Sequence, residues 1–219
     1  MKLAIKSIHK YLSLFISLQL LLWTISGIYF SYNKIEMVRG EHLRALQDKD
    51  VQINLAEFPA ITGKSIIGIT RLGQIIFKIN KGDETFYLDA KGKTIKPINS
   101  LQAMEIINTH TSLQSISAKQ ILTIPRGAEY RGRGLPLWQV ETDHPNKVNA
   151  YVDGMTGEVV AIRSSSWRLW DFLWGLHIMD YVDRDNINNL LMKIFSVLAL
   201  ISSLSGIALF FNTRKKSIS

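Results

Sequence analysis

Two long apolar runs constrain this chain more than any other feature. The first, Tyr11 to Phe30, is twenty residues without a charge, which at 1.5 Å per residue is enough to cross a hydrocarbon core of about 30 Å. The second, Leu190 to Phe211, contains one charge, Lys193, close to its start. Both runs predict transmembrane helices, so the residues between them should form a separate domain on one side of the membrane.

A cleaved signal peptide is the alternative interpretation of the first run. Its apolar stretch exceeds the roughly 7 to 15 residues of a signal-peptide core, and no A-x-A cleavage site follows it. We therefore expect the run to be retained as a transmembrane helix.

The net charge of +8 is a topology signal. Residues 33–188 contain 19 lysines and arginines and all 18 acidic residues, a balance of +1. The other seven positive charges lie at or near the two ends: Lys2, Lys6, Lys10, Lys193, Arg214, Lys215 and Lys216. By the positive-inside rule both termini are cytoplasmic and the middle is periplasmic, in a bacterial inner membrane. This distribution argues against nucleic-acid binding.

Composition and periodicity then divide the chain into six parts. We expect a cytoplasmic N-terminus (1–10), a first transmembrane helix (11–32), a periplasmic α+β domain (33–166), an interfacial aromatic helix with an acidic turn (167–188), a second transmembrane helix (189–211) and a cytoplasmic tail (212–219).

Alternating apolar residues and turn motifs predict antiparallel strands and one main helix in the middle domain. The expected strands are Ile66–Thr70, Gln74–Ile79, Glu84–Leu88, Lys119–Ile124, Leu137–Thr142, Val148–Val152 and Glu158–Ile162. A short helix is expected at Gly40–Leu46 and a loop at Asn54–Lys64. The main helix should run from Leu101 to His110, capped by Ser100, with Leu101, Met104, Ile107 and Ile106 buried.

The absence of cysteine leaves histidine as the remaining soft metal ligand. Disulfides, thiolate zinc sites, iron–sulfur clusters and Cys-linked haem are excluded. Of the five histidines, His110 and His144 fit structural roles, at a helix end and in a turn. His9 stands at the cytoplasmic entrance of the first span, where a merely interfacial role is the alternative to ligation.

An aromatic stripe surrounds His177. At 100° per residue, Trp167, Trp170, Trp174, His177 and Tyr181 fall within an arc of about 80° on one helix face. Tryptophan and tyrosine favour the headgroup level, so the stripe is typical of an interfacial anchor. It also fits the wall of a flat aromatic cofactor whose metal His177 ligates.

The two spans share one pattern at identical spacing. Ser17, Ser26-Gly27-Ile28 and Asn33 in the first match Ser196, Ser205-Gly206-Ile207 and Asn212 in the second. Since the helices run in opposite directions, the two glycines lie near opposite surfaces. They either let helices pack closely or admit the edges of planar cofactors, one near each surface.

The order of these motifs resembles the PepSY-associated transmembrane family. The motifs that carry the resemblance are Ile8-His9-Lys10-Tyr11-Leu12, Gln19-Leu20-Leu21-Leu22-Trp23 with Ser26-Gly27, Arg39-Gly40-Glu41-His42-Leu43, Leu135-Pro136-Leu137-Trp138, the Tyr151-Val152-Asp153 to Thr156-Gly157 hairpin, and Leu176-His177-Ile178-Met179-Asp180. The resemblance implies a PepSY-type periplasmic module carried on membrane helices. Relatives include haem-b inner-membrane reductases that act on ferric siderophores or assist iron uptake.

The resemblance implies that His9 and His177 are axial ligands of haem b, with Trp170 and Trp174 packed on the outer haem and Gly27 and Gly206 beside porphyrin edges. His9 and His177 lie at opposite surfaces and cannot share an iron. His9 of a second copy would complete the pair at His9. At His177 the second ligand would be His42 or His177 of a second copy. Larger relatives have four or more spans and this chain has two, which favours a homodimer.

The leading hypothesis is a dimeric haem-b oxidoreductase that passes electrons from a quinol or a cytoplasmic reductase to ferric iron or a ferric siderophore. No glycine fingerprint of a dinucleotide-binding fold is present. One alternative is a non-catalytic, membrane-tethered module that binds a periplasmic partner through the basic 126–135 loop. The others are an accessory subunit of a larger respiratory or iron-transport complex and a direct ferric site at Asp180, Asp183 and Asp185.

Overall fold

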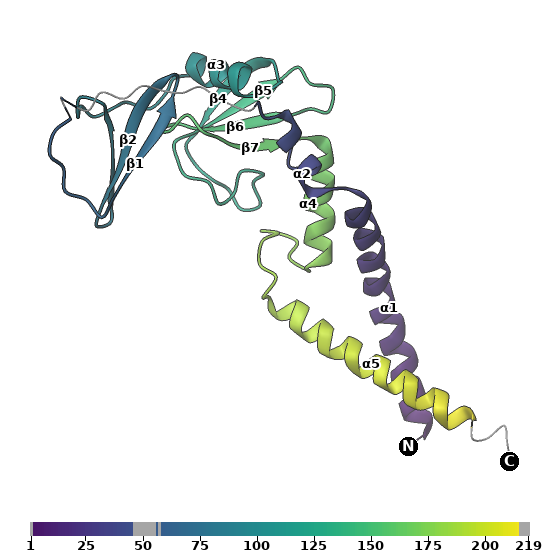
Figure 1. Cartoon of the computed structure of the whole chain (residues 1–219). Helices are drawn as coiled ribbons and strands as arrows, with labels where there is room; N and C mark the ends of the chain where they lie inside the picture. Colours follow the sequence, from purple (N-terminus) through teal and green to yellow (C-terminus); the bar gives the residue numbers. More distant parts are fainter. Residues whose placement is uncertain (1, 46–55, 57, 215–219) are drawn as a thin grey trace. The chain divides into compact units, whose positions relative to one another are not determined.

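The computed structural model describes residues 2–45, 56 and 58–214, and the side chains of residues 9–211 outside the same gap. The chain divides into two compact units. The membrane unit comprises Met1–Lys34 and Leu169–Ser219, and the sheet unit comprises Ile35–Arg168. Figure 1 shows the elements of each.

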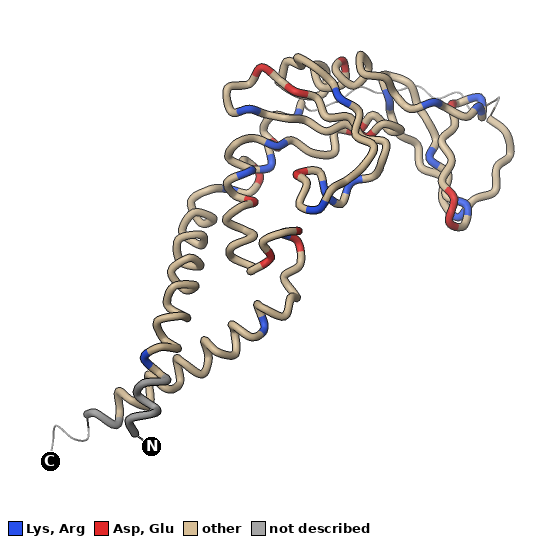
Figure 2. The backbone as a smooth tube through the Cα atoms, turned by 180° about the vertical axis from the view of Figure 1, so that it is seen from behind, with Lys and Arg blue, Asp and Glu red and all other residues tan. Residues whose placement is uncertain are grey.

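Three helices build the membrane unit: α1 (Lys2–Tyr32), the greater part of α4 (Ser165–His177), and α5 (Leu190–Arg214). Stretches His9–Tyr32 of α1 and Leu190–Phe211 of α5 are long and apolar enough to span a membrane. Only 11% and 6% of their most apolar windows are buried, unlike the core helix of a soluble domain. Figure 2 shows both helices almost free of coloured charge. The structure thus has two candidate transmembrane helices where the sequence predicts spans.

The sheet unit contains two antiparallel sheets, as the α+β prediction requires. The first has the order β1-β2-β3, formed by Ser65–Arg71, Gln74–Lys81 and Glu84–Asp89. The second has the order β4-β5-β6-β7, formed by Ser115–Ile121, Leu137–Thr142, Asn149–Asp153 and Val159–Arg163. Every connection joins neighbouring strands, so both sheets are simple meanders.

Helix α3 (Ser100–His110) covers the second sheet and forms the main core with it. Ala103, Ile106 and Ile107 are fully buried against β-strand residues such as Val140 and Val152. The prediction that Leu101 is buried is wrong, since its side chain is 74% exposed. Leu101 lies 200° around the helix from Ala103 and so points away from the sheet.

The N-terminal cap of α3 also differs from the prediction. Asn99, not Ser100, caps the helix: its Oδ1 accepts a hydrogen bond from the backbone N–H of Gln102. The Gln102 side chain accepts one in return from the backbone N–H of Asn99. This reciprocal capping box satisfies two backbone donors, whereas a cap at Ser100 would leave Asn99 without a role.

The start of the sheet unit is less helical than expected. α2 (Ile35–Val38) precedes a single 3-10 turn, η1 (Glu41–Leu43), where the prediction has a helix over Gly40–Leu46. Gly40 has a φ of +73°, and a Cβ there would lie 2.8 Å from Ile162 Cγ2. Only glycine fits this left-handed, crowded position, which interrupts the helical path. Leu46 and residues 54, 55 and 57 of the predicted loop lie outside the described residues.

One buried carboxylate anchors the loop of residues 122–136. Glu129 accepts hydrogen bonds from Arg168 Nε at 2.7 Å and Nη2 at 3.0 Å, from the Tyr151 hydroxyl and from Asn149. Burial alone would raise the pKa of the Glu129 carboxyl, but these hydrogen bonds outweigh it and lower the pKa below its ordinary value. The loop is thus tied to β6 and to the first turn of α4.

This network predicts a pH-dependent stability of the sheet unit. Because the pKa of Glu129 is lower in the folded chain than in the unfolded one, its contribution is complete above the unfolded pKa and is lost as pH falls through the folded pKa. At pH 7, Glu129→Gln should lower the free energy of unfolding by about 2 kcal/mol, the typical size for hydrogen bonds to a charged group. The difference from wild type should shrink in acid.

Thermal unfolding of the full chain in detergent, followed by circular dichroism between pH 7 and pH 3, measures this effect. Glu105→Gln, which neutralises an exposed carboxylate on α3, is the matched control and should have little effect. A constant difference between Glu129→Gln and wild type over the whole pH range would contradict the prediction.

Candidate functional site

His177, the last residue of α4, lies against the middle of the outer half of α1, the half that ends at Tyr32. Its Nδ1 is 2.7 Å from the Ser26 hydroxyl, which is almost completely buried. Ser26 precedes Tyr32 by six residues, or about 9 Å along the helix axis. The imidazole therefore lies within the span of α1 and not at its end.

The hydrogen bonds of Ser26 favour one tautomer of His177. The Ser26 hydroxyl lies 2.8 Å from the Leu22 carbonyl and 3.1 Å from the Trp23 carbonyl of its own helix. When its single proton goes to one of these carbonyls, its oxygen accepts from Nδ1–H of His177. That tautomer leaves the Nε2 lone pair of a neutral imidazole available, the form that ligates metals.

His9 has the same arrangement at the other end of α1. Its Nδ1 is 2.7 Å from the Ser205 hydroxyl of α5, and Ser205 donates its proton to the Ser202 carbonyl at 2.8 Å. The same arrangement favours the tautomer of His9 that carries its proton on Nδ1. The Ser13 hydroxyl, which is 3.0 Å from that of Ser202, makes long contacts with both ring nitrogens of His9, 3.5 Å to Nδ1 and 3.4 Å to Nε2.

The repeated Ser-Gly pair of the two spans thus marks both histidines. Ser26 and Ser205 hold the imidazoles, and Gly27 and Gly206 follow them. A Cβ at Gly27 would meet nothing within 4 Å, and one at Gly206 would meet only His9 Cε1, at 3.8 Å. In the described part of the chain neither glycine is needed for close helix packing, and the space beside Gly27 is open.

Helix α4 ends inside the span, and each of its last carbonyls has a partner. Gln19 Nε2 donates to the Leu176 carbonyl at 3.1 Å, and Trp23 Nε1 donates to the His177 carbonyl at 2.6 Å. The Trp174 and Gly175 carbonyls accept from the backbone N–H groups of residues 178 and 180. Because an unpaired carbonyl in hydrocarbon costs several kcal/mol, Gln19 and Trp23 fix the depth at which α4 ends.

Part of the predicted aromatic stripe forms a stack beside His177. The rings of Trp170 and Trp174 are 5.4 Å apart and 15° from parallel, and those of Trp174 and His177 are 6.2 Å apart and 8° from parallel. Phe30 of α1 contacts all three rings at centroid distances of 5.0 to 6.2 Å. The stack joins α4 to α1.

Trp167 and Tyr181, the first and last residues of the predicted stripe, lie outside this stack. Trp167 is buried in the sheet unit under the guanidinium of Arg163, 4.2 Å from its ring centroid. Tyr181 lies beyond the end of α4, because Met179 has a left-handed backbone with φ of 54° that ends the helix. The prediction that Tyr181 lies on the same helix face as His177 is therefore wrong.

The acidic turn after α4 is tied back to the helix. Asp171, which is almost fully buried, forms an ion pair with Arg184 at 3.3 Å, and Arg184 packs where a Cβ on Gly175 would lie. The Asp180 carboxylate accepts from the backbone N–H groups of residues 183, 185 and 186. Among the described residues no three His, Asp or Glu side chains come together to hold a metal ion.

The remaining histidines lie in the sheet unit. His42 is exposed in η1. His110 ends α3, where burial lowers the pKa of its imidazole. His144 accepts from the backbone N–H of Asn146 within a turn. The last two have the structural positions predicted for them.

Sequence reasoning singled out both histidines but missed the residues that position them. Ser26 and Ser205 were noted only beside their glycines, and Gln19 and Trp23 only as parts of a motif. The identical spacing of Ser-Gly in two antiparallel spans, each near a histidine, could have pointed to Ser26 and Ser205. Gln19 and Trp23 could have been found as two hydrogen-bond donors at i and i+4 in a largely apolar helix.

A family model described as the PepSY-associated TM region matches residues 6–218, which confirms the resemblance over nearly the whole chain. Searches of curated proteins and of solved structures gave no match.

The contact between α1 and α5 can be tested by engineered cysteines, since the chain has none of its own. The Ser13 and Ser202 hydroxyls are 3.0 Å apart, so the double variant Ser13→Cys, Ser202→Cys should form a disulfide within one chain on mild oxidation. Non-reducing electrophoresis after proteolysis between the helices measures it. The neighbouring pair Leu14→Cys, Ser203→Cys, both exposed, should not cross-link within a chain. Equal cross-linking of both pairs would contradict the helix contact.

Proposed function

The chain belongs to the PepSY-associated transmembrane family, and we propose that it is a haem-b oxidoreductase of the bacterial inner membrane, with both termini cytoplasmic. The observation that carries the proposal is that Nδ1 of both His9 and His177 lies 2.7 Å from a serine hydroxyl. Nε2 of His177 then has no described partner, and Nε2 of His9 has only a 3.4 Å contact with Ser13. Histidines that ligate metals almost always make a hydrogen bond through their other ring nitrogen.

The donor set suits a haem better than a bare ion. No cluster of three protein ligands forms among the described residues, whereas a haem iron needs only one or two axial ligands from the protein. His9 and His177 would each supply one. Haem b, when bound, supplies one-electron transfer. The serines hold the imidazoles in the ligating tautomer, and the open side of Gly27 leaves room for a planar group.

Trp170 and Trp174 would line such a haem site beside His177. Trp174 is 8° from parallel to His177 at a centroid distance of 6.2 Å, and Trp170 stacks on Trp174. Their role would be to orient the imidazole and to exclude water.

Each haem would be held by one of these two histidines and by a second histidine where one is in reach. On α1, His9 and Ser26 are 17 residues apart, or about 26 Å, so two separate haem layers are required. A homodimer would supply a second His9 and a second His177, and His42 is the other candidate for the outer pair. Large apolar side chains remain exposed along both spans, which leaves surface for a second copy as well as for lipid.

Two layers within the span would carry electrons from a quinol or a cytoplasmic reductase toward the periplasm. The proposed acceptor is ferric iron, free or held by a siderophore. Reduction to Fe(II) weakens binding by hard oxygen ligands and would release the iron for uptake.

A non-catalytic role of the sheet unit, as a module that binds a periplasmic partner or a larger complex, is the second candidate. It is supported by the basic loop of residues 126–135. Arg131 and Arg163 both lie over the ring of Trp167. Burial, and then the nearby charge of Arg133, lower the pKa of Arg163 to about 10. Such a gathering of like charges favours an anionic partner.

A reduced-minus-oxidised absorption spectrum of the purified chain tests the haem proposal. Wild type should show b-type bands, and His9→Ala and His177→Ala should each lose about half of the haem because each removes one of two layers. Ser26→Ala and Ser205→Ala should weaken haem binding by about tenfold to a hundredfold in a titration, the usual effect of removing the partner of a metal-bound histidine.

His144→Ala, which changes a turn histidine of the sheet unit, is the matched control and should keep the full spectrum. Absence of b-type bands in wild type would sink the proposal. So would full haem retention in both His9→Ala and His177→Ala, and the sheet-unit role would then be the better explanation.

A further inference from the structure

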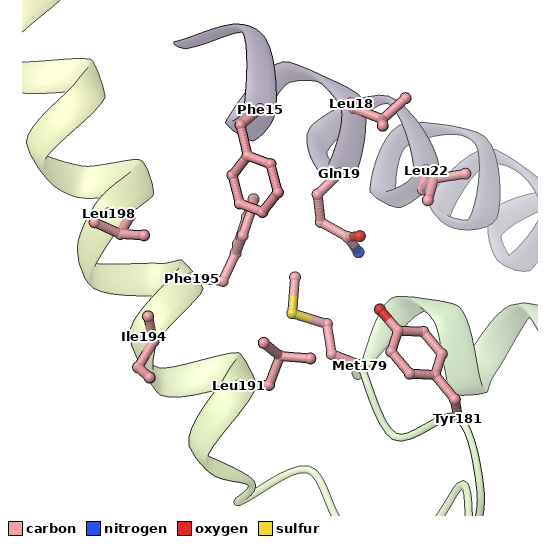
Figure 3. A pocket seen from close by; sticks show the side chains of 10 residues that line it. All are labelled: Phe15, Leu18, Gln19, Leu22, Met179, Tyr181, Leu191, Ile194, Phe195 and Leu198. Carbon is pink, nitrogen blue, oxygen red and sulfur yellow. The ribbon is translucent and has the colours of Figure 1, made fainter. Parts of the chain in front are cut away.

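The membrane unit contains one more feature that the haem proposal does not use. A cavity of about 310 Å³ lies between α1, α5 and the segment after α4, at the low end of the size range for small-molecule sites. Figure 3 shows its walls: Phe15, Leu18, Gln19, Leu22, Met179, Tyr181, Leu191, Ile194, Phe195 and Leu198. Eight of these ten side chains are apolar.

The two polar side chains point into this cavity (Figure 3). Gln19 uses one N–H for the Leu176 carbonyl, and no described residue bonds its Oε1. Tyr181 likewise has no hydrogen-bond partner among the described residues. Gln19 is ten residues from His9 and thirteen from Tyr32, so it lies near the centre of the span. Polar groups at that depth are costly and usually mark a functional site.

These two groups define the chemistry of the occupant. A carboxamide and a phenol can each donate and accept a hydrogen bond. A lipid acyl chain would satisfy neither. A quinol has two hydroxyls and needs hydrogen-bond acceptors, whereas the corresponding quinone has two carbonyls and needs donors. Gln19 and Tyr181 together suit both redox forms. The cavity is lined by exposed residues of two membrane spans, including Phe15 and Leu191, so a ligand dissolved in the bilayer can reach it.

The cavity is also connected to His177 through aromatic contacts. Phe195, one of its walls, meets Trp23 edge to face with a centroid distance of 5.3 Å. The ring of Trp23 lies 5.9 Å from that of His177 and donates to the His177 carbonyl. Two ring contacts therefore separate the cavity wall from the imidazole.

We propose that this cavity binds the ring of a membrane quinone or quinol, with Gln19 and Tyr181 as its hydrogen-bonding partners. The use of the bound quinol as electron donor rests on the proposed function. The binding itself does not, and it can be measured whether or not haem is present.

The test titrates the full chain in nanodiscs with a short-chain ubiquinone analogue and follows quenching of tryptophan fluorescence. Wild type should show saturable quenching, because Trp23 adjoins the cavity. Tyr181→Phe, which removes only a hydroxyl, should weaken binding about tenfold, the upper size for one hydrogen bond. Leu198→Phe should weaken it more by filling the cavity while leaving both polar groups in place. Thr24→Val, a change at an exposed position of the same span, is the control and should bind as wild type does.

An alkyl alcohol with the same chain length as the quinone's tail is the competitor. Failure of the alcohol to displace the quinone supports recognition of the ring. The proposal is overturned if wild type shows no saturable quenching, if the alcohol competes equally well, or if Tyr181→Phe and Leu198→Phe both bind as wild type does. Haem bands without quinone binding would leave the proposed function standing and remove this inference. Quinone binding without haem bands would leave this inference standing and remove the proposed function.

Discussion

A helix that ends within a membrane span must find partners for its last carbonyl groups, and this requirement organises the membrane unit. Water is not available there, so α4 can end beside Ser26 only because α1 presents donors at the right height. Gln19 and Trp23, one helical turn apart, bond the Leu176 and His177 carbonyls. The depth and rotation of α4 follow from these two bonds. They place the His177 imidazole against Ser26 and Trp174 against Phe30.

In both histidine sites a serine hydroxyl of one helix contacts Nδ1 of a histidine on another helix. The two sites differ in which helix supplies the serine. At one end α1 supplies the histidine and α5 the serine, while at the other α1 supplies the serine and the histidine comes from α4. In both, the serine donates its proton to a carbonyl of its own helix and so accepts from the imidazole. A serine in a helix makes this bond readily, because a carbonyl three or four residues back is always within reach. The repeat of Ser-Gly in antiparallel spans therefore produces a similar site near each surface.

Patterns that depend on neighbours in sequence predicted most of the fold. Apolar length and end charges predicted both candidate spans, and alternation predicted seven strands, because residues that alternate along a strand share one buried face. The strand predicted at Lys119–Ile124 is displaced, since β4 covers Ser115–Ile121. Predictions failed where a single backbone conformation decides the outcome: the left-handed Met179 ends α4 before Tyr181, and the Asn99 cap begins α3 a residue early. The bonds between serine and histidine join residues 151 and 196 positions apart. No local pattern contains such pairs, so the histidines were predicted and their partners were not.

The chain alone leaves the membrane unit incomplete in a specific way. Nε2 of His177 accepts from no described residue, Gly27 faces open space, and only a small share of either span is buried. In water such groups would be solvated, but an imidazole acceptor about 9 Å inside a span has no water to bind. A group that accepts the electron pair of Nε2 beside the open side of Gly27 would complete this site, and the haem proposed above is one such group.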